Sequence, residues 1–215
     1  MLSKIKNRLN KITAWITLLT IMSQPFICLA QTTADDKAPV NNQAQVSKTT
    51  NDVIQVNIVN PDSNGLSHNI YKDFNIDEKG LILNNSFNNI DTQLAGQIQG
   101  NSKLTNGSAK IILNEVTGSN ISNLNGTLEV AGQRADVIIA NPNGIVGNNF
   151  TLINTNRAVL TTGVPTFGGS GSLERFRVTK GEIRIEDDGI NAVDTEKIDL
   201  IARAVVINED INAKE

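Results

Sequence analysis

The sequence has few residues that could crosslink the chain or bind metal. It contains one cysteine, Cys28, and one histidine, His68, in 215 residues. Cys28 falls within an amino-terminal segment that we predict to be cleaved, so the mature chain has no cysteine. Its fold must therefore be stabilised by packing and hydrogen bonds without disulfides. One histidine without cysteine also leaves a zinc site short of its usual ligands.

Aromatic side chains and helical periodicity are also scarce. Aromatic residues make up 4% of the chain, whereas β-sandwich cores usually depend on Trp and Phe packing. After residue 30, no window of about a dozen residues combines a helical apolar repeat with helix formers and caps. A chain of this length can still form one domain with a sizeable core.

The start of the chain lacks negative charge. No acidic residue precedes Asp35, and four basic residues open the sequence: Lys4, Lys6, Arg8 and Lys11. A short apolar run over residues 12–19 and a cleavage pattern ending at Ala30 follow. This order predicts a secretory signal peptide over residues 1–30, handled by the Sec machinery. The alternative, a transmembrane anchor, needs about 20 apolar residues, more than the run contains.

Cleavage would make the remaining chain acidic. The whole sequence has 19 basic and 22 acidic residues; removing four basic residues leaves 15 against 22, a formal charge of −7. No basic stripe remains to neutralise phosphates, so we expect no nucleic acid partner. Residues 31–51 are mostly polar and predict a flexible leader before a domain over residues 52–215.

Short apolar segments bounded by Gly, Asn, Asp or Ser recur along the rest of the chain and indicate an almost purely β protein. We predict strands at residues 53–59, 80–85, 109–114, 126–130, 135–140, 150–154, 157–160, 176–178, 182–185, 198–201 and 204–207. Many of them are followed by asparagine: Asn84, Asn114, Asn141, Asn154 and Asn208. Corner asparagines that adopt left-handed backbone angles and bond to the next coil are typical of a parallel β-helix. The pattern leaves a sandwich or barrel as alternatives, because the strand spacing is irregular.

The segment Asn141-Pro142-Asn143-Gly144-Ile145 follows one of the buried runs. Pro142 sets φ near −65° and cannot donate to a strand ladder, while Asn143 and Gly144 tolerate positive φ. Ile145 then returns to the core. Taken alone, the segment predicts a sharp corner.

An ordered set of motifs resembles the amino-terminal secretion domain of two-partner-secretion exoproteins, the family of filamentous haemagglutinin, the haemolysins of that route and contact-dependent inhibition toxins. The motifs are residues 65–69, 71–75, 80–85, 112–116, 128–132, 140–145 and 153–155. The resemblance covers residue 53 to the end of the sequence. It implies an all-β fold, a right-handed single-stranded parallel β-helix with short extra-helical β elements.

The resemblance also implies which residues carry function. The family's secretion motif matches Asn141, Pro142, Asn143, Gly144 and Ile145, acting through fold nucleation, transporter contact or both. Further signature residues with structural or recognition roles are Ser67, His68, Asn69, Asp73, Phe74, Asn75, Asn84, Asn85, Asn114 and Glu115. Two departures stand out: Gly147 and Phe150 replace a Cys-x-x-Cys pair, and residues 119–122 lack the proline of an earlier Asn-Pro motif.

The implied partner is a TpsB-type outer-membrane transporter with POTRA domains, which recognises the chain in the periplasm of a Gram-negative bacterium. The exported protein would be secreted or held at the cell surface, and a downstream region would act on a host or neighbouring cell. The sequence stops after a strand-like run without a capping pattern, which predicts a fragment or a truncated end.

Two alternatives to an export domain follow from the residues. Glu182, Glu186, Asp187 and Asp188 could bind calcium or act as the carboxylates of a polysaccharide lyase-like β-helix enzyme, although a solvated turn explains them more simply. Direct adhesion by this segment is the other. Ser67 and His68 would point to opposite faces of an extended segment, so they form no triad. No pattern supplies a catalytic, cofactor or metal site, and we expect no enzyme activity.

Overall fold

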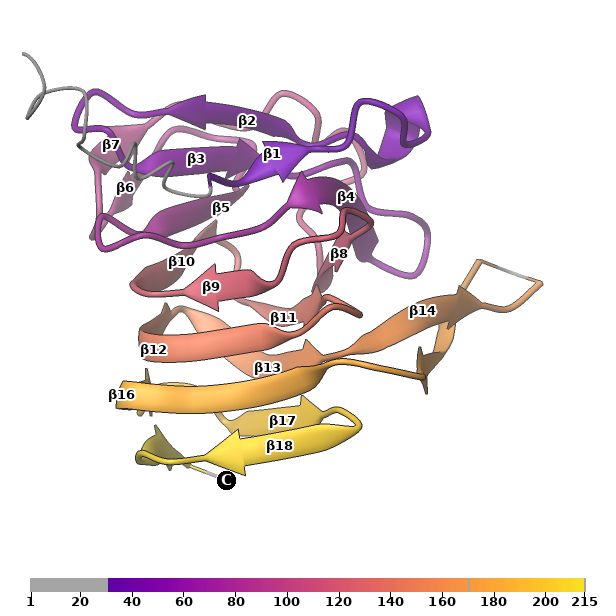
Figure 1. Ribbon diagram of the computed structural model, residues 1–215. Coiled ribbons are helices and arrows are strands. Elements are labelled where there is room, and N and C mark those ends of the chain that lie inside the picture. Colours follow the sequence, from indigo (N-terminus) through magenta and orange to yellow (C-terminus); the bar gives the residue numbers. More distant parts are fainter. Residues whose placement is uncertain (1–30, 170, 215) are drawn as a thin grey trace, which may run out of the picture.

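The computed structural model describes residues 31–169 and 171–214 (Figure 1). The predicted signal peptide over residues 1–30 lies outside these residues. Within the described part of the chain, none of the helices has the length and apolar character needed to cross a membrane. The only helix there is the short 3-10 turn η1 (Val40–Asn42).

The chain winds into coils that stack in sequence order from the indigo end to the yellow end of Figure 1. One side of the stack is a six-stranded sheet, called sheet A, with the order β1-β4-β8-β11-β13-β17. Its strands are β1 (Thr33–Ala34), β4 (Leu66–Asp73), β8 (Ile111–Val116), β11 (Ala135–Ala140), β13 (Thr155–Thr161) and β17 (Lys197–Ile201). All neighbours from β4 to β17 pair in parallel.

A second sheet, called sheet B, wraps the other two sides. Its order is β18-β16-β12-β10-β5-β3-β2, with β9 also on β12 and β19 also on β16. The strands are β2 (Gln45–Lys48), β3 (Ile54–Asn57), β5 (Leu81–Asn85), β9 (Ser122–Leu124), β10 (Thr127–Gly132), β12 (Ile145–Ile153), β16 (Glu182–Ala192), β18 (Ala204–Ile207) and β19 (Ile211–Ala213). β12 and β16 are long enough to turn a corner, with positive φ at Asn149 and Asp187. The result is a three-sided parallel β-helix, which confirms the predicted fold class.

In-register aliphatic side chains fill the interior. Along sheet B, Ile54 pairs with Leu81, and Leu81 with Leu128. All three are at most 4% exposed. Stacking of this kind removes apolar surface from water at about 25 cal/mol per Å². Every strand predicted from the sequence is present.

The predicted flexible leader over residues 31–51 was wrong. β1 pairs antiparallel with β4, and β2 pairs antiparallel with β3 at the end of sheet B. Polar composition misled the prediction, because backbone pairing orders most of this segment, and only a few small apolar side chains such as Ala44 and Val46 pack on the core. It covers the open backbone edge of the first coil, and Lys48 lies on its own exposed edge.

Two antiparallel hairpins lie outside the coils. β6 (Ile90–Thr92) and β7 (Gly96–Ile98) pack beside β10, where both carboxylate oxygens of buried Glu129 accept the backbone N–H groups of Gln93 and Leu94. β14 (Gly163–Phe167) and β15 (Leu173–Val178) project from the stack in Figure 1. Gly168, Gly169 and Gly171 lie at the turn of this second hairpin.

Candidate functional site

Consecutive turns from sheet A to the next side of the helix lie one above another. They comprise residues 74–75, 117–121, 141–144, 162 with 179–181, and 202–203, each following the end of a sheet A strand. We call this set the corner column. The predicted secretion motif occupies its middle level, between the turns of the preceding and the following coil.

Asn141 is fully buried in this column. Its side-chain Nδ2 donates to the Asn120 carbonyl at 3.0 Å and to Ser122 Oγ at 2.9 Å. Its Oδ1 accepts the backbone N–H of Asn143 at 3.0 Å. The side chain therefore closes its own turn and also fastens that turn to the preceding coil.

Asn143 is partly buried and bonds in both directions along the column. Its Nδ2 donates to the Gly118 carbonyl at 2.8 Å, and its Oδ1 accepts from Lys180 Nζ at 2.8 Å. The backbone of the motif adds the bond from Ser122 N–H to the Gly144 carbonyl and the bond from Asn141 N–H to the Thr161 carbonyl. One turn thus joins three coils.

The rest of the motif provides shape. Gly144 has a φ of +133°, a value that L side chains rarely adopt. Asn143 does not share this conformation, so the expectation of positive φ holds for the glycine alone. Ile145 is buried and pairs with Ser122 and Ile183 on either side. Pro142 caps the end of β11 without offering a donor.

Phe74 and Asn75 form the first turn of the same column, two levels above the motif, and Asp73 is the last residue of the strand before that turn. Asp73 Oδ1 accepts from Asn120 Nδ2 at 2.7 Å, and Asn75 Oδ1 accepts the backbone N–H of Asn123 at 2.8 Å. Phe74 is buried and packs edge-on against Tyr71, with ring centroids 5.0 Å apart. The segment 119–122, which lacks the family's proline, therefore sits between Asp73 and the motif and supplies the acceptors for Asn141.

The other signature residues lie away from the column. Ser67, Asn69 and Asn114 are buried inside sheet A. Asn69 Oδ1 accepts the Val59 N–H, and Asn114 Oδ1 accepts the Tyr71 hydroxyl. Burial raises the pKa of Tyr71 far above its usual range. These hydrogen bonds satisfy the polar groups that are buried inside the first coils.

Asn84 and Asn85 are the last two residues of β5, at a different corner. Asn84 Nδ2 donates to Asn57 Oδ1, and Asn85 Nδ2 donates to the carbonyls of Ala109 and Gln133. Bonds between coils were predicted for asparagines after strands, and they form here and at Asn154. Left-handed backbone angles were predicted too, but among the asparagines named for this role only Asn154 shows one, with φ of 56°.

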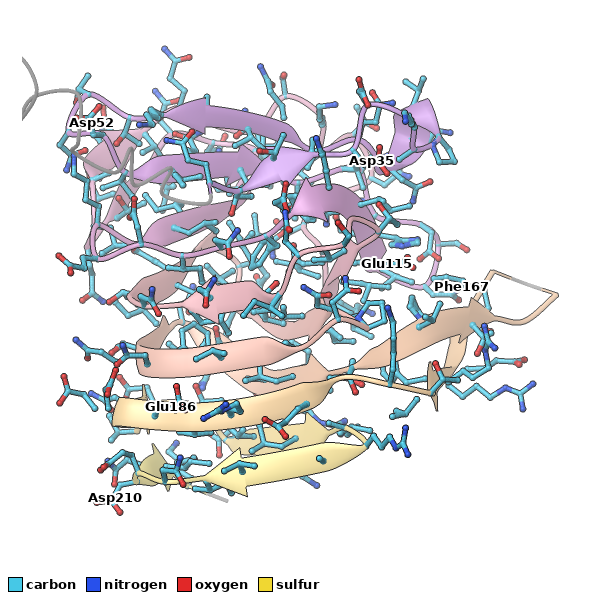
Figure 2. All side chains as sticks on the ribbon, viewed as in Figure 1. Asp35, Asp52, Glu115, Phe167, Glu186 and Asp210 are labelled. Atoms are coloured by element: carbon cyan, nitrogen blue, oxygen red, sulfur yellow. The ribbon has the colours of Figure 1, made fainter. Side chains whose placement is uncertain are left out.

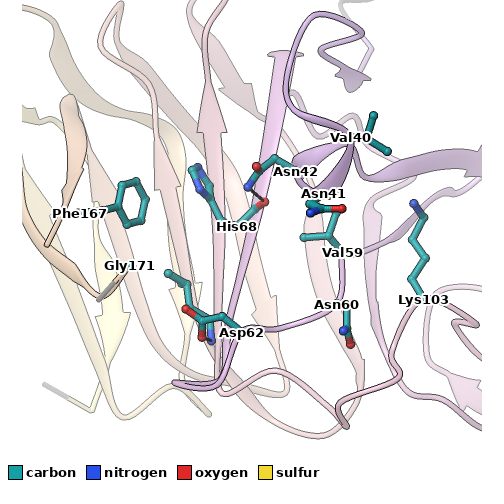
Figure 3. A pocket seen from close by; sticks show the side chains of 11 residues that line it. Val40, Asn41, Asn42, Val59, Asn60, Asp62, His68, Lys103, Phe167 and Gly171 are labelled. Atoms are coloured by element: carbon teal, nitrogen blue, oxygen red, sulfur yellow. Dashed lines mark hydrogen bonds between the residues drawn. The ribbon is translucent and has the colours of Figure 1, made fainter. Parts of the chain in front are cut away.

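His68 and Glu115 meet on the outer face of sheet A, with Nε2 and Oε2 2.7 Å apart. Ser67 points to the opposite face, as expected for neighbouring residues of a strand. The pair is partly buried beside a cleft of about 680 Å³ (Figure 3). A hydrogen bond between the His68 and Glu115 side chains explains His68 without a catalytic role.

The acidic segment does not gather into a site. Arg184 lies between Glu182 and Glu186, within salt-bridge distance of both, and Glu186 lies on the surface of β16 (Figure 2). Within residues 31–169 and 171–214, no three His, Cys, Asp or Glu side chains could hold a metal ion together. The residues that replace the Cys-x-x-Cys pair are both buried: Phe150 belongs to the core, and Gly147 makes room for Ile185.

The sequence did not reveal which residues of neighbouring coils contact the motif. A Cβ on Gly118 would lie 2.0 Å from the Lys72 carbonyl oxygen, and one on Gly181 would lie 2.7 Å from the Pro142 carbonyl oxygen. Asn120, Ser122 and Lys180 were likewise not identified as its partners. Their signal is weak in one sequence, because each of these residues is constrained by contacts with another coil.

Comparisons with known proteins show which family this chain resembles. The model of the TPS secretion domain matches residues 30–215. The chain is 46% identical over 177 residues to 16S rRNA endonuclease CdiA of Enterobacter cloacae, which covers 81% of this chain and 5% of that protein. It is 38% identical over 222 residues to tRNA nuclease CdiA-2 of Burkholderia pseudomallei, covering 96% of this chain and 7% of that protein.

A solved structure agrees with these relatives. The crystal structure of a filamentous hemagglutinin secretion domain superposes with a TM-score of 0.73 at 38% identity, covering 81% of this chain and 56% of that one. The chain spans only 5% to 7% of the CdiA proteins named here, so their nuclease names describe proteins far longer than this chain. The matched family is a secretion domain and not a catalytic one. The chain belongs to the TPS secretion domain family, the secretion domain of filamentous haemagglutinin and CdiA-type exoproteins.

Proposed function

We propose that this domain directs export by folding, with Asn141–Ile145 as the segment on which both depend. In this scheme the signal peptide delivers the chain through the Sec machinery to the periplasm. A TpsB-type outer-membrane transporter with POTRA domains then receives it unfolded. A region beyond this domain acts on a host or neighbouring cell as an adhesin or toxin.

The observation that carries the proposal is the burial of Asn141. Its side chain is fully enclosed, and both of its polar atoms are paired within the domain. A partner therefore cannot bind this side chain in the folded state without breaking those bonds. The transporter can contact it only in the extended chain, and folding then withdraws it from the transporter.

Withdrawal of the motif supplies a direction for export. Once the motif turn has joined three coils, each further coil buries its aliphatic side chains against the edge of the preceding one, at about 25 cal/mol per Å² of apolar surface. Folding outside the membrane thus opposes backward movement of the chain. No nucleotide hydrolysis is needed for this bias.

The test is export of Asn141→Ala and Asn143→Ala variants through the cognate transporter. Asn191→Ala is the matched control, because Asn191 is exposed on β16 and its side chain has no hydrogen bond among the described residues. We expect the Asn141→Ala variant to lose at least about nine-tenths of its export, because its turn loses the bonds to the preceding coil. Undiminished export of both motif variants would contradict the role proposed for the motif.

A further inference from the structure

The turn directly below the motif is interrupted. Thr162 leaves β13, the chain runs out along β14 and back along β15, and residues 179–181 lead into β16. Gly163 pairs with Val178 at the base of this hairpin, which brings the two halves of the turn together. Hence the turn exists as a unit only when the hairpin is formed.

This interrupted turn supports the motif from below. The Thr161 carbonyl accepts the Asn141 N–H at 2.9 Å, and Lys180 reaches Asn143 Oδ1. Gly181 has a φ of +81° and approaches the Pro142 carbonyl so closely that a Cβ would lie 2.7 Å from it. Small displacements of residues 179–181 would therefore open the motif.

The hairpin is docked on the outer face of sheet A. That face carries an apolar strip whose members come from four successive coils and are at most 6% exposed: Leu66, Leu113, Ile138, Ala140 and Val159. Leu113, Ile138 and Val159 are stacked in register. Leu173 and Phe176 of β15 pack against this strip. The outer face of a coil would otherwise expose these side chains to water.

The tip of the hairpin reaches the first coil. The Phe167 ring packs on His68 with centroids 4.9 Å apart and a tilt of 31°, and His68 is paired with Glu115 of the next coil. Figure 3 shows Phe167 beside His68 at one wall of the cleft. The hairpin therefore spans the coils from β4 to β13.

Docking depends on side chains. Ser172 aside, the hydrogen bonds of the described hairpin residues stay within the hairpin or join Gly163 N–H to Thr161 Oγ1 at its base. Arg175 and Arg177 are exposed, and neither guanidinium group makes an ion pair or hydrogen bond in the described chain. Removing the apolar contacts would therefore undock the hairpin without breaking a strand ladder between coils.

We propose that the β14–β15 hairpin is a clamp that completes the export motif. By docking on the strip, it holds Thr162 and residues 179–181 beneath Pro142 and Asn143. The motif turn can close through its own side chains, but its contacts with Lys180 and Gly181 in the coil below form only after the chain up to residue 181 has folded. Leu173, Phe176 and Phe167 are thus positioning residues for a turn that none of them belongs to. This inference rests on the function proposed above for the motif.

The experiment compares a Leu173→Ser/Phe176→Ser double variant with an Arg175→Ser/Arg177→Ser control on the same strand. Hydrogen exchange is measured in the purified chain at the amides of Asn141, Asn143 and Gly144, and export is measured through the cognate transporter. In the double variant we expect exchange at these amides to rise about tenfold or more. Amides of β4 and β8 should keep their protection, and export should fall in step. The control should match the unaltered chain.

The outcomes separate the two proposals. Unchanged exchange in the double variant, or faster exchange with full export, would overturn the clamp. Reduced export with unchanged exchange would also overturn it, because the hairpin would then act by direct contact.

If Asn141→Ala were itself exported normally, the motif's proposed function would fail, and the exchange data alone would decide the clamp. If the double variant lost protection in β4 and β8 as well, Phe167→Ala, which removes only the tip contact, is judged by the same outcomes.

Discussion

Two successive turns of the corner column are closed in different ways. The turn at residues 141–144 is closed by its own side chains, since Asn141 Oδ1 accepts the Asn143 N–H. The turn below it, Thr162 with residues 179–181, has no such lock and is closed by pairing of Gly163 with Val178 at the base of a hairpin. The first can form from a few neighbouring residues, whereas the second needs a docked excursion.

This difference assigns different roles to the two turns. A locally closed turn can form early and hold the preceding coil through Asn120 and Ser122. A turn that waits for a hairpin forms later, because its closure requires contacts with coils already built. The order of closure therefore follows the order of the chain, as a vectorial export process would require.

The largest expected effect comes from breaking the self-closed turn. Asn141→Ala removes two donated bonds and leaves the buried Ser122 hydroxyl and Asn120 carbonyl without this partner. We expect a loss of about 3–4 kcal/mol in the free energy of unfolding. Denaturant unfolding of the purified chain checks it, with Asn191→Ala as the control. A loss below about 1 kcal/mol would mean that the turn does not depend on its side-chain lock.

The next effect is on the hairpin-closed turn. Gly181→Ala adds a Cβ at a φ of +81° and 2.7 Å from the Pro142 carbonyl oxygen. We expect it to cost about 2–3 kcal/mol. Gly171→Ala is the matched control, since Gly171 also has positive φ but no atom near its Cβ position; it should cost only about 1 kcal/mol. Thermal unfolding of both variants measures the difference, and equal losses would rule out the close approach.

Alkaline pH should lower the stability of the folded chain through Tyr71, which lies in the coil above both turns. Burial raises the pKa of Tyr71 in the folded state, so the unfolded chain releases this proton first, above about pH 10. Stability should then fall by about 1.4 kcal/mol per pH unit above pH 10. Tyr71→Phe, which removes the chain's single tyrosine, should abolish that part of the slope. Identical slopes for the two proteins between pH 10 and pH 11 would refute the prediction.

The smallest effect is expected at the link between the two turns. Lys180 is exposed and contributes one hydrogen bond to Asn143 Oδ1. Lys180→Met should therefore cost about 0.5 kcal/mol and leave export within about twofold. Parallel unfolding and export assays test this. A loss as large as that of Gly181→Ala would show that the lysine, and not the backbone approach, joins the turns.

The sequence predicted the coils well because period-two apolar segments such as residues 135–140 are local signals. It failed at residues 31–51, whose strands depend on the free edge of β3 and on β4. The motif was identified through its resemblance to a family, and turn chemistry predicted Gly144 correctly. Gly118 and Gly181 could not be identified, because each is constrained by a carbonyl that lies far away in sequence.

The most direct test of the account is a variant that leaves the motif sequence intact but disturbs the turn above it. Gly118→Ala places a Cβ 2.0 Å from the Lys72 carbonyl oxygen and so displaces the carbonyl that binds Asn143; Gly169→Ala, with open space at its Cβ position, is the control. If the motif works by folding, export of Gly118→Ala through the cognate transporter falls at least about tenfold, as for Asn141→Ala, whereas Gly169→Ala is exported normally. Normal export of Gly118→Ala beside blocked export of Asn141→Ala would show that export depends on recognition of the extended motif alone and not on its folding, contrary to this account.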